Sequence, residues 1–322
     1  MAPVRSVIAL LFFCCVFKYT EPAPQYDDYV YSDEDQTPVC DESNCKLPQC
    51  SCFLAQPKVS VPDRPQFLMI TFDDAITVAN IETYKKIAAK KVPMTFFVCH
   101  EYNDYSLTQK LYNEGHEIAV HSIRSYMDPP IWPYTLDHGY GQDCQIEPCP
   151  KGNFEGLWEV PMIQYHRWSK EGGDFFCSML DACTPQPDTA ADTKDFLMKN
   201  FLRHYKSNKA PFPIFLHEAW LRNNARLQGF LQFLDEVLKN PDVIAATLRD
   251  VVEYIRNPTT YREFKPYKHS PPKSCNKVEI CNYKELSRFM KSCVMCPKYY
   301  PWVGSPLGKV PPKNFPNFES LF

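Results

Sequence analysis

Short apolar runs alternate with amphipathic segments along two stretches of the chain. Residues 66–72 (QFLMITF) have the length and apolar character of a buried strand, and residues 76–91 then carry apolar positions at helical spacing. Strands that alternate with helices in this way are typical of a parallel α/β sheet or barrel. The same criteria predict further strands at residues 94–99, 117–121, 212–217 and 243–247, and further helices at residues 107–113, 193–205, 226–239 and 248–256.

The alternation stops in the middle of the chain. Residues 128–187 are rich in Pro, Gly, Trp and Cys and show no regular period. The pattern therefore predicts about five strands, whereas a closed (β/α) barrel needs about eight. One or two central βα units, of roughly 30 residues each, are expected to be absent.

The two ends of the chain differ from this pattern. The apolar run at residues 7–17 follows Arg5 and is too short to span a bilayer, so it predicts a secretory signal, cleaved near Ala23, rather than a membrane anchor. An acidic, Tyr-rich stretch without apolar periodicity comes next, as in a flexible leader. The predicted organisation is a signal at residues 1–23, a flexible acidic leader at 24–39, an α/β domain with an N-terminal cysteine strap at 40–258, and a Cys- and Pro-rich wrap at 259–322.

Cysteine usage agrees with an exported protein. The chain has 15 Cys, and in exported proteins such residues usually pair in disulfides. Cys14 and Cys15 would leave with the signal, and Cys99, in an apolar run, is predicted to stay a buried free thiol. The others fall in four clusters within which they can pair: Cys40, Cys45, Cys50 and Cys52; Cys144 and Cys149; Cys177 and Cys183; and Cys275, Cys281, Cys293 and Cys296.

Titratable side chains stand at the ends of three predicted strands. Asp73 and Asp74 follow the strand at residues 66–72, and His121 and His217 end two later strands. Because the carboxyl ends of parallel strands meet at one edge of a sheet, these four side chains are expected to converge. A lone Asp or His is usually a cap or a satisfied polar group, but adjacent acids at the end of an apolar strand cost desolvation energy and favour a functional site. Two carboxylates and two imidazoles together suit a divalent metal ion with acid–base catalysis.

The sequence around these residues resembles the polysaccharide deacetylases, the NodB-like carbohydrate esterases. Residues 70–74 (ITFDD) are similar to the first motif of that family, residues 115–122 (GHEIAVHS) to a following segment, and residues 215–220 (FLHEAW) to its late LH-x-x-W motif. The cysteine strap, residues 131–136 (IWPYTL) and residues 293–302 (CVMCPKYYPW) resemble secreted arthropod chitin deacetylases, most of all the gut-type branch without a chitin-binding module.

This resemblance implies a fold and a reaction. The fold would be a distorted (β/α) barrel, and the reaction would remove acetyl groups from the N-acetylglucosamine units of chitin by means of water activated on a metal ion, giving chitosan and acetate. By the same resemblance, Asp73 would be the general base and His217 the general acid. Asp74 and His121 would bind Zn²⁺, and Trp220 would help to wall the acetyl pocket.

Two departures from the family pattern bear on activity. The second motif of the family ends in another metal-binding histidine, where this chain has Ser125, a poor zinc ligand. His138, in the irregular stretch, is the candidate substitute. The third motif, R-x-P-F/Y, supplies an oxyanion contact in the family and has no counterpart between Ser125 and Ile131.

Three hypotheses follow from the resemblance and its departures. The chain is an active chitin deacetylase, a catalytically inactive relative that binds chitin, or a truncated isoform or gene model of an active enzyme. A disulfide-rich structural protein would explain the cysteines but not Asp73, Asp74, His121 and His217 together. By the same resemblance we expect a secreted, extracellular monomer whose partner is chitin or a chitin oligosaccharide. Nucleic acid and membranes are not expected as partners, because the net charge of −3 gives no basic surface for nucleic acid or an anionic membrane.

Overall fold

A computed structural model describes residues 40–100, 102–119, 125–126, 130–139, 152–169, 173–267, 275–302 and 305–311. The chain divides into a unit of residues 1–37 and a unit of residues 38–322, and the second unit contains all of these residues. The predicted signal and leader, and the predicted pair of Cys144 and Cys149, lie outside them.

The fold is built around β1 (Gln66–Asp73), a strand buried along its whole length. It pairs in parallel with β10 (Phe212–His217), with β2 (Met94–Phe97) and, at its beginning, with β11 (Val243–Ala245). The fifth strand of this sheet, β3 (Glu117–Ala119), pairs in parallel with β2. All five strands predicted from apolar runs are therefore confirmed.

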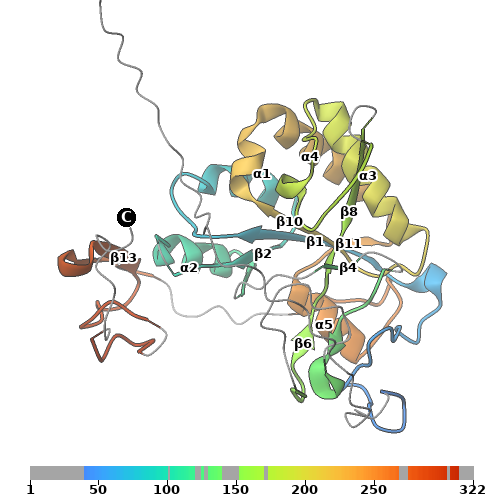
Figure 1. The fold of residues 1–322 in the computed structure, drawn as a ribbon, viewed down its shortest axis with the longest axis horizontal. Helices are drawn as coiled ribbons and strands as arrows, with labels where there is room; N and C mark the ends of the chain where they lie inside the picture. The colour runs from blue at the N-terminus through green and yellow to red at the C-terminus, as the bar shows by residue number, and fades with distance from the viewer. Residues whose placement is uncertain are drawn as a thin grey trace, which may run out of the picture. The chain divides into compact units, whose positions relative to one another are not determined.

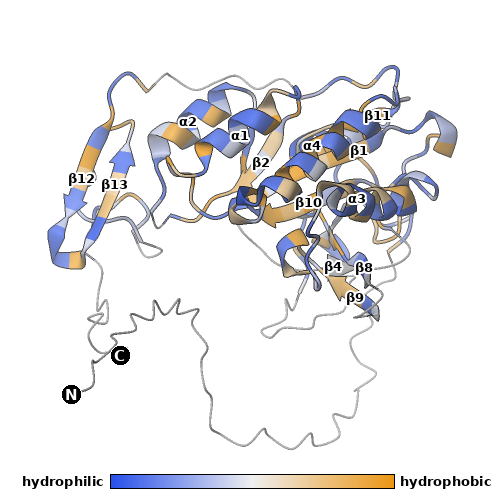
Figure 2. Ribbon diagram, turned by 90° about the horizontal axis from the view of Figure 1, so that it is seen from above, coloured by the Kyte–Doolittle hydropathy of each residue, from blue (hydrophilic) through white to orange (hydrophobic). Residues whose placement is uncertain are grey.

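Helices cover both faces of this sheet because successive β1 side chains point to opposite faces. Leu68, Ile70 and Phe72 pack in one core cluster with apolar residues of α1, α3 and α4, whereas Phe67 and Met69 pack with α5 on the other face (Figure 1). Figure 2 shows β2 and β10 as largely hydrophobic ribbons, as expected for strands buried on both faces. The α-helices are α1 (Ile81–Ala88), α2 (Tyr105–Asn113), α3 (Ala190–Tyr205), α4 (Asn224–Val237) and α5 (Leu248–Arg256).

The first predicted helix starts later than its apolar spacing suggested. Asn80 Oδ1 accepts a hydrogen bond from the Thr77 amide, and Asn80 Nδ2 donates to the carbonyl of Ala75, so the side chain of Asn80 holds the preceding residues in a turn. The amide of Ile76 donates to Asn103 Oδ1. The helix therefore begins at Ile81.

The middle of the chain, predicted to be irregular, contains short strands. They pair with one another and, within the described residues, add no strand to the five-stranded sheet, so the barrel is incomplete as predicted. The longest pair is a hairpin of β8 (Tyr165–Ser169) and β9 (Gly173–Cys177). The remaining short elements here are β4 (Ser125–Tyr126), which pairs with β7 (Met162–Ile163), β5 (Tyr134–Thr135), which pairs with β6 (Trp158–Glu159), and the 3₁₀-helices η2 (Leu136–His138) and η3 (Leu180–Ala182).

The side chain of Tyr165 lies along the free edge of β10. Its hydroxyl donates to the carbonyl of Pro213 at 2.7 Å and accepts from the amide of Phe215 at 3.0 Å. Tyr165 is fully buried, so β8 is joined to the main sheet through this side chain.

Disulfides form within the predicted clusters. The described pairs are Cys40–Cys52, Cys45–Cys50, Cys177–Cys183, Cys275–Cys293 and Cys281–Cys296. Cys99 takes part in no disulfide, as predicted, but it is partly exposed rather than buried.

The C-terminal segment contacts the α/β domain at α2. It forms an antiparallel hairpin that the sequence did not predict, in which Lys291 Nζ lies 2.8 Å from Asp104 Oδ2, the N-cap carboxylate of α2. No helix among the residues described is both long and apolar enough to cross a membrane. The remaining elements are β12 (Glu279–Tyr283), β13 (Arg288–Ser292) and the 3₁₀-helices η1 (Val61–Asp63), η4 (Glu218–Arg222) and η5 (Lys284–Leu286).

Candidate functional site

Three of the predicted site residues meet at the carboxyl edge of the main sheet. Asp73 and His217 end β1 and β10 and are direct neighbours in the parallel register. Together with Asp74 they line a cavity of about 450 Å³. The convergence predicted from strand ends is thus found for these three, whereas His121 lies outside the described residues.

The two adjacent carboxylates have different surroundings. Asp73 is 7% exposed, whereas the Asp74 side chain is 66% exposed. Asp74 has a φ of +79°, and its amide donates to the carbonyl of Phe97. A positive φ is uncommon for a residue with a side chain, and such strained positions cluster at functional sites. This turn directs the Asp74 carboxylate toward His217 instead of continuing the strand.

His217 is held between two carboxylates. Its Nδ1 lies 2.6 Å from Asp181 Oδ2, and its Nε2 lies 3.7 Å from Asp74 Oδ2. The hydrogen bond that His217 donates to Asp181 raises the pKa of His217, against the opposing effect of partial burial, and the charges of Asp74 and Asp73 add to the rise. Asp181 fixes Nδ1 as the donor, so Nε2 is the ring nitrogen directed at the cavity.

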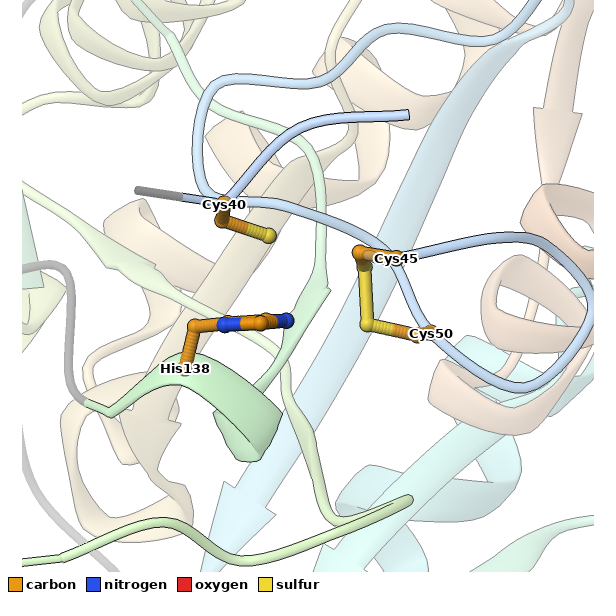
Figure 3. Close-up of side chains that lie close together, drawn as sticks. All are labelled: Cys40, Cys45, Cys50 and His138. Atoms are coloured by element: carbon orange, nitrogen blue, oxygen red, sulfur yellow. A yellow bond between two sulfur atoms is a disulfide. The ribbon is translucent and has the colours of Figure 1, made fainter. Parts of the chain in front are cut away.

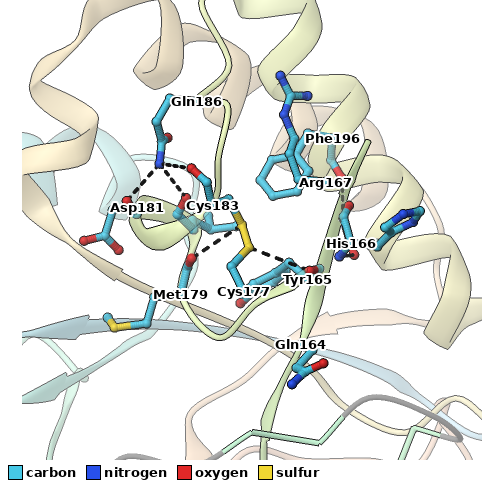
Figure 4. The surroundings of a disulfide bond; sticks show 12 residues. Gln164, Tyr165, His166, Arg167, Cys177, Met179, Asp181, Cys183, Gln186 and Phe196 are labelled. Carbon is cyan, nitrogen blue, oxygen red and sulfur yellow. Dashed lines mark hydrogen bonds between the residues drawn. A yellow bond between two sulfur atoms is a disulfide. The ribbon is translucent and has the colours of Figure 1, made fainter. Parts of the chain in front are cut away.

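Asp181 is a functional candidate that the sequence interpretation missed. It lies on η3 inside the loop closed by the Cys177–Cys183 disulfide. Gln186 Nε2 donates to the carbonyls of Asp181 and Cys183 at 2.8 and 2.6 Å, which fixes the same loop from outside (Figure 4). The available signal was an acidic residue between two closely spaced cysteines, CSMLDAC.

Trp220 takes part in this support and is not among the residues that line the cavity. It is 4% exposed, packs in the main core, and its Nε1 donates to Gln186 Oε1. Its side chain therefore holds Gln186, which in turn holds the loop of Asp181. The predicted role of Trp220 as a wall of the acetyl pocket stays a prediction.

Glu218, directly after His217, is buried and anchors the turn that follows β10. Its carboxylate accepts a hydrogen bond from Thr83 Oγ1 and lies 2.9 Å from Arg222 Nε. Both partners satisfy a carboxylate that would otherwise be costly to bury. The position of His217 is thereby tied to α1.

The described donors fit a zinc ion incompletely at this edge. Asp74 is one suitable ligand, but no group of three metal-binding side chains forms around it within the part of the chain that the structure describes. Ser125, at the position where the family has its second metal-binding histidine, offers no imidazole.

A different cluster contains the histidine considered as a substitute ligand. His138 lies beside Cys40, Cys45 and Cys50 (Figure 3). All three cysteines are in disulfides and cannot act as thiolate ligands. His138 is not among the residues that line the Asp73–His217 cavity. Among the described residues, no group of metal-binding side chains contains both His138 and Asp74, so the structure does not bring the candidate substitute to the Asp74 site.

Known proteins resemble this chain over most of its length. Residues 60–143 match the family model for polysaccharide deacetylase. Chitin deacetylase 8 of Bombyx mori is 30% identical over 364 aligned positions, which cover 84% of this chain and 93% of that protein. Chitin deacetylase 1 of Bombyx mori is 29% identical over 380 positions, covering 86% and 70%.

Two solved structures show weaker likeness. A structure described as a polysaccharide deacetylase from Mycobacterium smegmatis has a TM-score of 0.43 at 16% identity, covering 71% of this chain and 100% of the other. The Xyl-CE4 domain of a multidomain xylanase from the hindgut metagenome of Trinervitermes trinervoides has a TM-score of 0.34 at 13% identity, covering 64% and 98%.

The aligned lengths reveal residues that this chain lacks. The alignment with chitin deacetylase 8 has 364 positions, but 84% of 322 residues is only about 270. About 94 positions of the relative therefore have no residue here. At roughly 30 residues for each βα unit, that is the size of about three units, somewhat more than the one or two expected from the strand pattern.

Proposed function

The chain belongs to the polysaccharide deacetylase family and is a chitin deacetylase-like protein. On this premise we propose that it retains the acid–base residues of a deacetylase site but lacks a complete set of metal ligands. Its ligand would be chitin or a chitin oligosaccharide, and its catalysis would be impaired. The observation that carries this proposal is the row of interacting side chains Asp181, His217 and Asp74. It is combined with a serine, Ser125, at the sequence position where the family has its second metal-binding histidine.

The proposed acid–base residues are His217 and Asp73. Hydrolysis of an amide needs one group to take a proton from water and another to give a proton to the departing amine. The Asp181 carboxylate raises the pKa of His217 and so keeps its proton available for the amine. The buried carboxylate of Asp73, the neighbour of His217 in the sheet, is the proposed base.

The site departs from its family in its metal ligands. A bound zinc ion would polarise the acetyl carbonyl and its attacking water. Of the proposed ligands, Asp74 lines the cavity with Asp73 and His217, His121 remains a prediction, and Ser125 offers no imidazole. We therefore expect weak zinc binding and slow or no release of acetate.

The relatives and the disulfides support a proposal for the substrate and the location of the protein. Both Bombyx mori proteins are chitin deacetylases by name. Five disulfides among the described residues suit an oxidising compartment and support secretion. We propose an extracellular protein that meets chitin there.

Zinc content and acetate release test this function. Purified protein is expected to hold well under one zinc ion per chain and to release little acetate from N-acetylglucosamine hexamers. The Ser125→His variant is expected to bind zinc at least about tenfold more tightly, since losing even a supporting hydrogen bond to a ligand costs 10- to 100-fold in metal affinity. Asp74→Asn in that background is the matched control and should remove the gain. Full zinc occupancy and rapid acetate release by the wild type would contradict the proposal.

A second candidate is a truncated product of a gene that encodes an active enzyme. The observation in its favour is the absence of about 94 alignment positions. Transcript reads across the codons for His121 to Ile131 test it directly. Reads from a longer form would support truncation, whereas continuous reads with no longer form would refute it.

A further inference from the structure

A second groove lies between the β8–β9 hairpin and α3. Its volume is about 630 Å³, within the range of ligand sites, and it shares no lining residue with the Asp73–His217 cavity. Trp168 and Phe176 of the hairpin line one wall, and Lys199 and Asn200 of α3 line the other. The known site of this family does not account for it, because none of its predicted residues is there.

The hairpin turns aromatic rings toward solvent on one face. His166 pairs with Phe176 and Trp168 with Asp174 in the antiparallel register, so these four side chains share a face. The rings of His166 and Phe176 stack at 5.0 Å with an angle of 19°. Trp168 is 59% exposed and Phe176 is 45% exposed. Exposed aromatic side chains gathered on one face are typical of a binding surface.

The groove is held rigidly before any ligand arrives. Asn200 Oδ1 accepts from the His166 amide at 2.8 Å, and Asn200 Nδ2 donates to the His166 carbonyl at 3.0 Å. Two nitrogens of Arg167 each lie 2.7 Å from an oxygen of Asp192. The Cys177–Cys183 disulfide fixes the end of β9 (Figure 4). Binding would therefore need little ordering of side chains, which favours affinity.

The charged side chains that line the groove already have partners. Arg167 forms its paired contact with Asp192, Lys199 Nζ lies 2.7 Å from Asp195, and Arg203 donates to the carbonyl of Gln164. His166 Nε2 lies 2.5 Å from Asp174. A surface whose charges are already paired has little attraction for a charged ligand such as a nucleic acid or an acidic peptide. An uncharged ligand with apolar faces and a polar rim fits it better.

We propose that this groove is an accessory binding site for a chitin chain, with N-acetylglucosamine rings stacked on Trp168 and Phe176. A β-linked pyranose presents apolar C–H faces to an aromatic ring and directs its hydroxyl and amide groups sideways, where the exposed side chains of Lys199 and Asp195 lie. The choice of chitin rests on the proposed function. The same segment also reaches the first site, because β9 leads through the Cys177–Cys183 loop to Asp181.

Two sites on one protein would act together on a polymer. A chain held at the hairpin raises the local concentration of neighbouring sugar units at the Asp73–His217 cavity, without any new contact there. Binding to long chitin would therefore depend on the hairpin more than binding to a single sugar does.

The test compares the Trp168→Ala/Phe176→Ala double variant with Phe289→Ala, which removes an equally exposed ring from β13. Retention on insoluble chitin and the Kd for N-acetylglucosamine hexamers are measured by pull-down and calorimetry. The double variant is expected to bind the hexamer about tenfold more weakly, and Phe289→Ala to match the wild type. Thermal unfolding checks that all three proteins are folded.

Unchanged binding by the double variant would overturn the accessory site, and so would a wild type that does not bind chitin. A dimeric wild type that becomes monomeric in the variant, with chitin binding unaltered, would identify the face as an interface between copies and also overturn it. Asp74→Asn separates the two proposals. Binding that survives Asp74→Asn but not the hairpin change belongs to the groove, whereas zinc and acetate results bear on the proposed function alone.

Discussion

Burial of His116 makes the stability of this protein sensitive to mild acid. The side chain is 4% exposed, its Nδ1 accepts a hydrogen bond from the Met94 amide at 3.1 Å, and its ring meets that of Phe96 edge-on. Burial lowers the pKa of His116 to about 4. Protonation of Nδ1 would place a charge in the core and break the bond to Met94, so the folded state keeps the ring neutral.

The sign of the effect follows from the two pKa values. In the unfolded chain His116 takes up a proton near pH 6.5, whereas in the folded chain it does so only near pH 4. The unfolded state therefore binds more protons between these values, and stability is lost as the pH falls from 6.5 toward 4. At 1.36 kcal/mol per pH unit, the loss from His116 at pH 5 is about 2 kcal/mol.

Denaturant unfolding at pH 7 and pH 5, with disulfides intact, measures this loss. His116→Asn keeps an acceptor near the Met94 amide but does not titrate in this range. We expect the wild type to lose about 2 kcal/mol more than His116→Asn between the two pH values. His138→Asn, at a partly exposed histidine, is the control and should follow the wild type. Equal losses in wild type and His116→Asn would refute the reasoning.

Two further substitutions test the packing that supports the site. Gly229→Ala should lower the unfolding free energy by about 1–3 kcal/mol, because the new Cβ would lie 2.4 Å from the Ala190 carbonyl oxygen where α4 meets α3. An unchanged melting temperature would contradict this prediction. Trp220→Phe should lower the unfolding free energy by about 1–3 kcal/mol, because it leaves Gln186 Oε1 without its donor. It should also loosen the loop of Asp181 and so broaden the NMR signal of the His217 Nδ1 proton. Retention of both the stability and that signal would contradict the supporting role of Trp220.

The strands could be predicted because their signal is local. Five apolar runs of strand length form one sheet, and each was recognisable without its neighbours. The meeting of Asp73, Asp74 and His217 followed from this, since parallel strands bring their carboxyl ends to one edge. Helix ends were less predictable where a side chain such as Asn80 competes for backbone groups.

The support of the site could not be predicted in the same way. Asp181 reaches His217 across 36 positions of sequence, and Trp220 reaches Gln186 across 34. Neither contact produces a periodic pattern of residues in the sequence. The β8–β9 hairpin was missed because its aromatic residues face solvent, so its apolar pattern does not describe a buried face.

The hydroxyl of Tyr165 has a consequence for whether two molecules can associate through the edge of β10. In a parallel sheet, one residue of a neighbouring strand would engage a carbonyl of β10 and the amide two residues later. Tyr165 engages that pair of groups at Pro213 and Phe215 with a single oxygen atom. An open strand edge invites pairing with the edge of another molecule. No strand among the described residues pairs with this edge of β10, and the Tyr165 phenol occupies the groups at Pro213 and Phe215 that a strand of a second molecule would need.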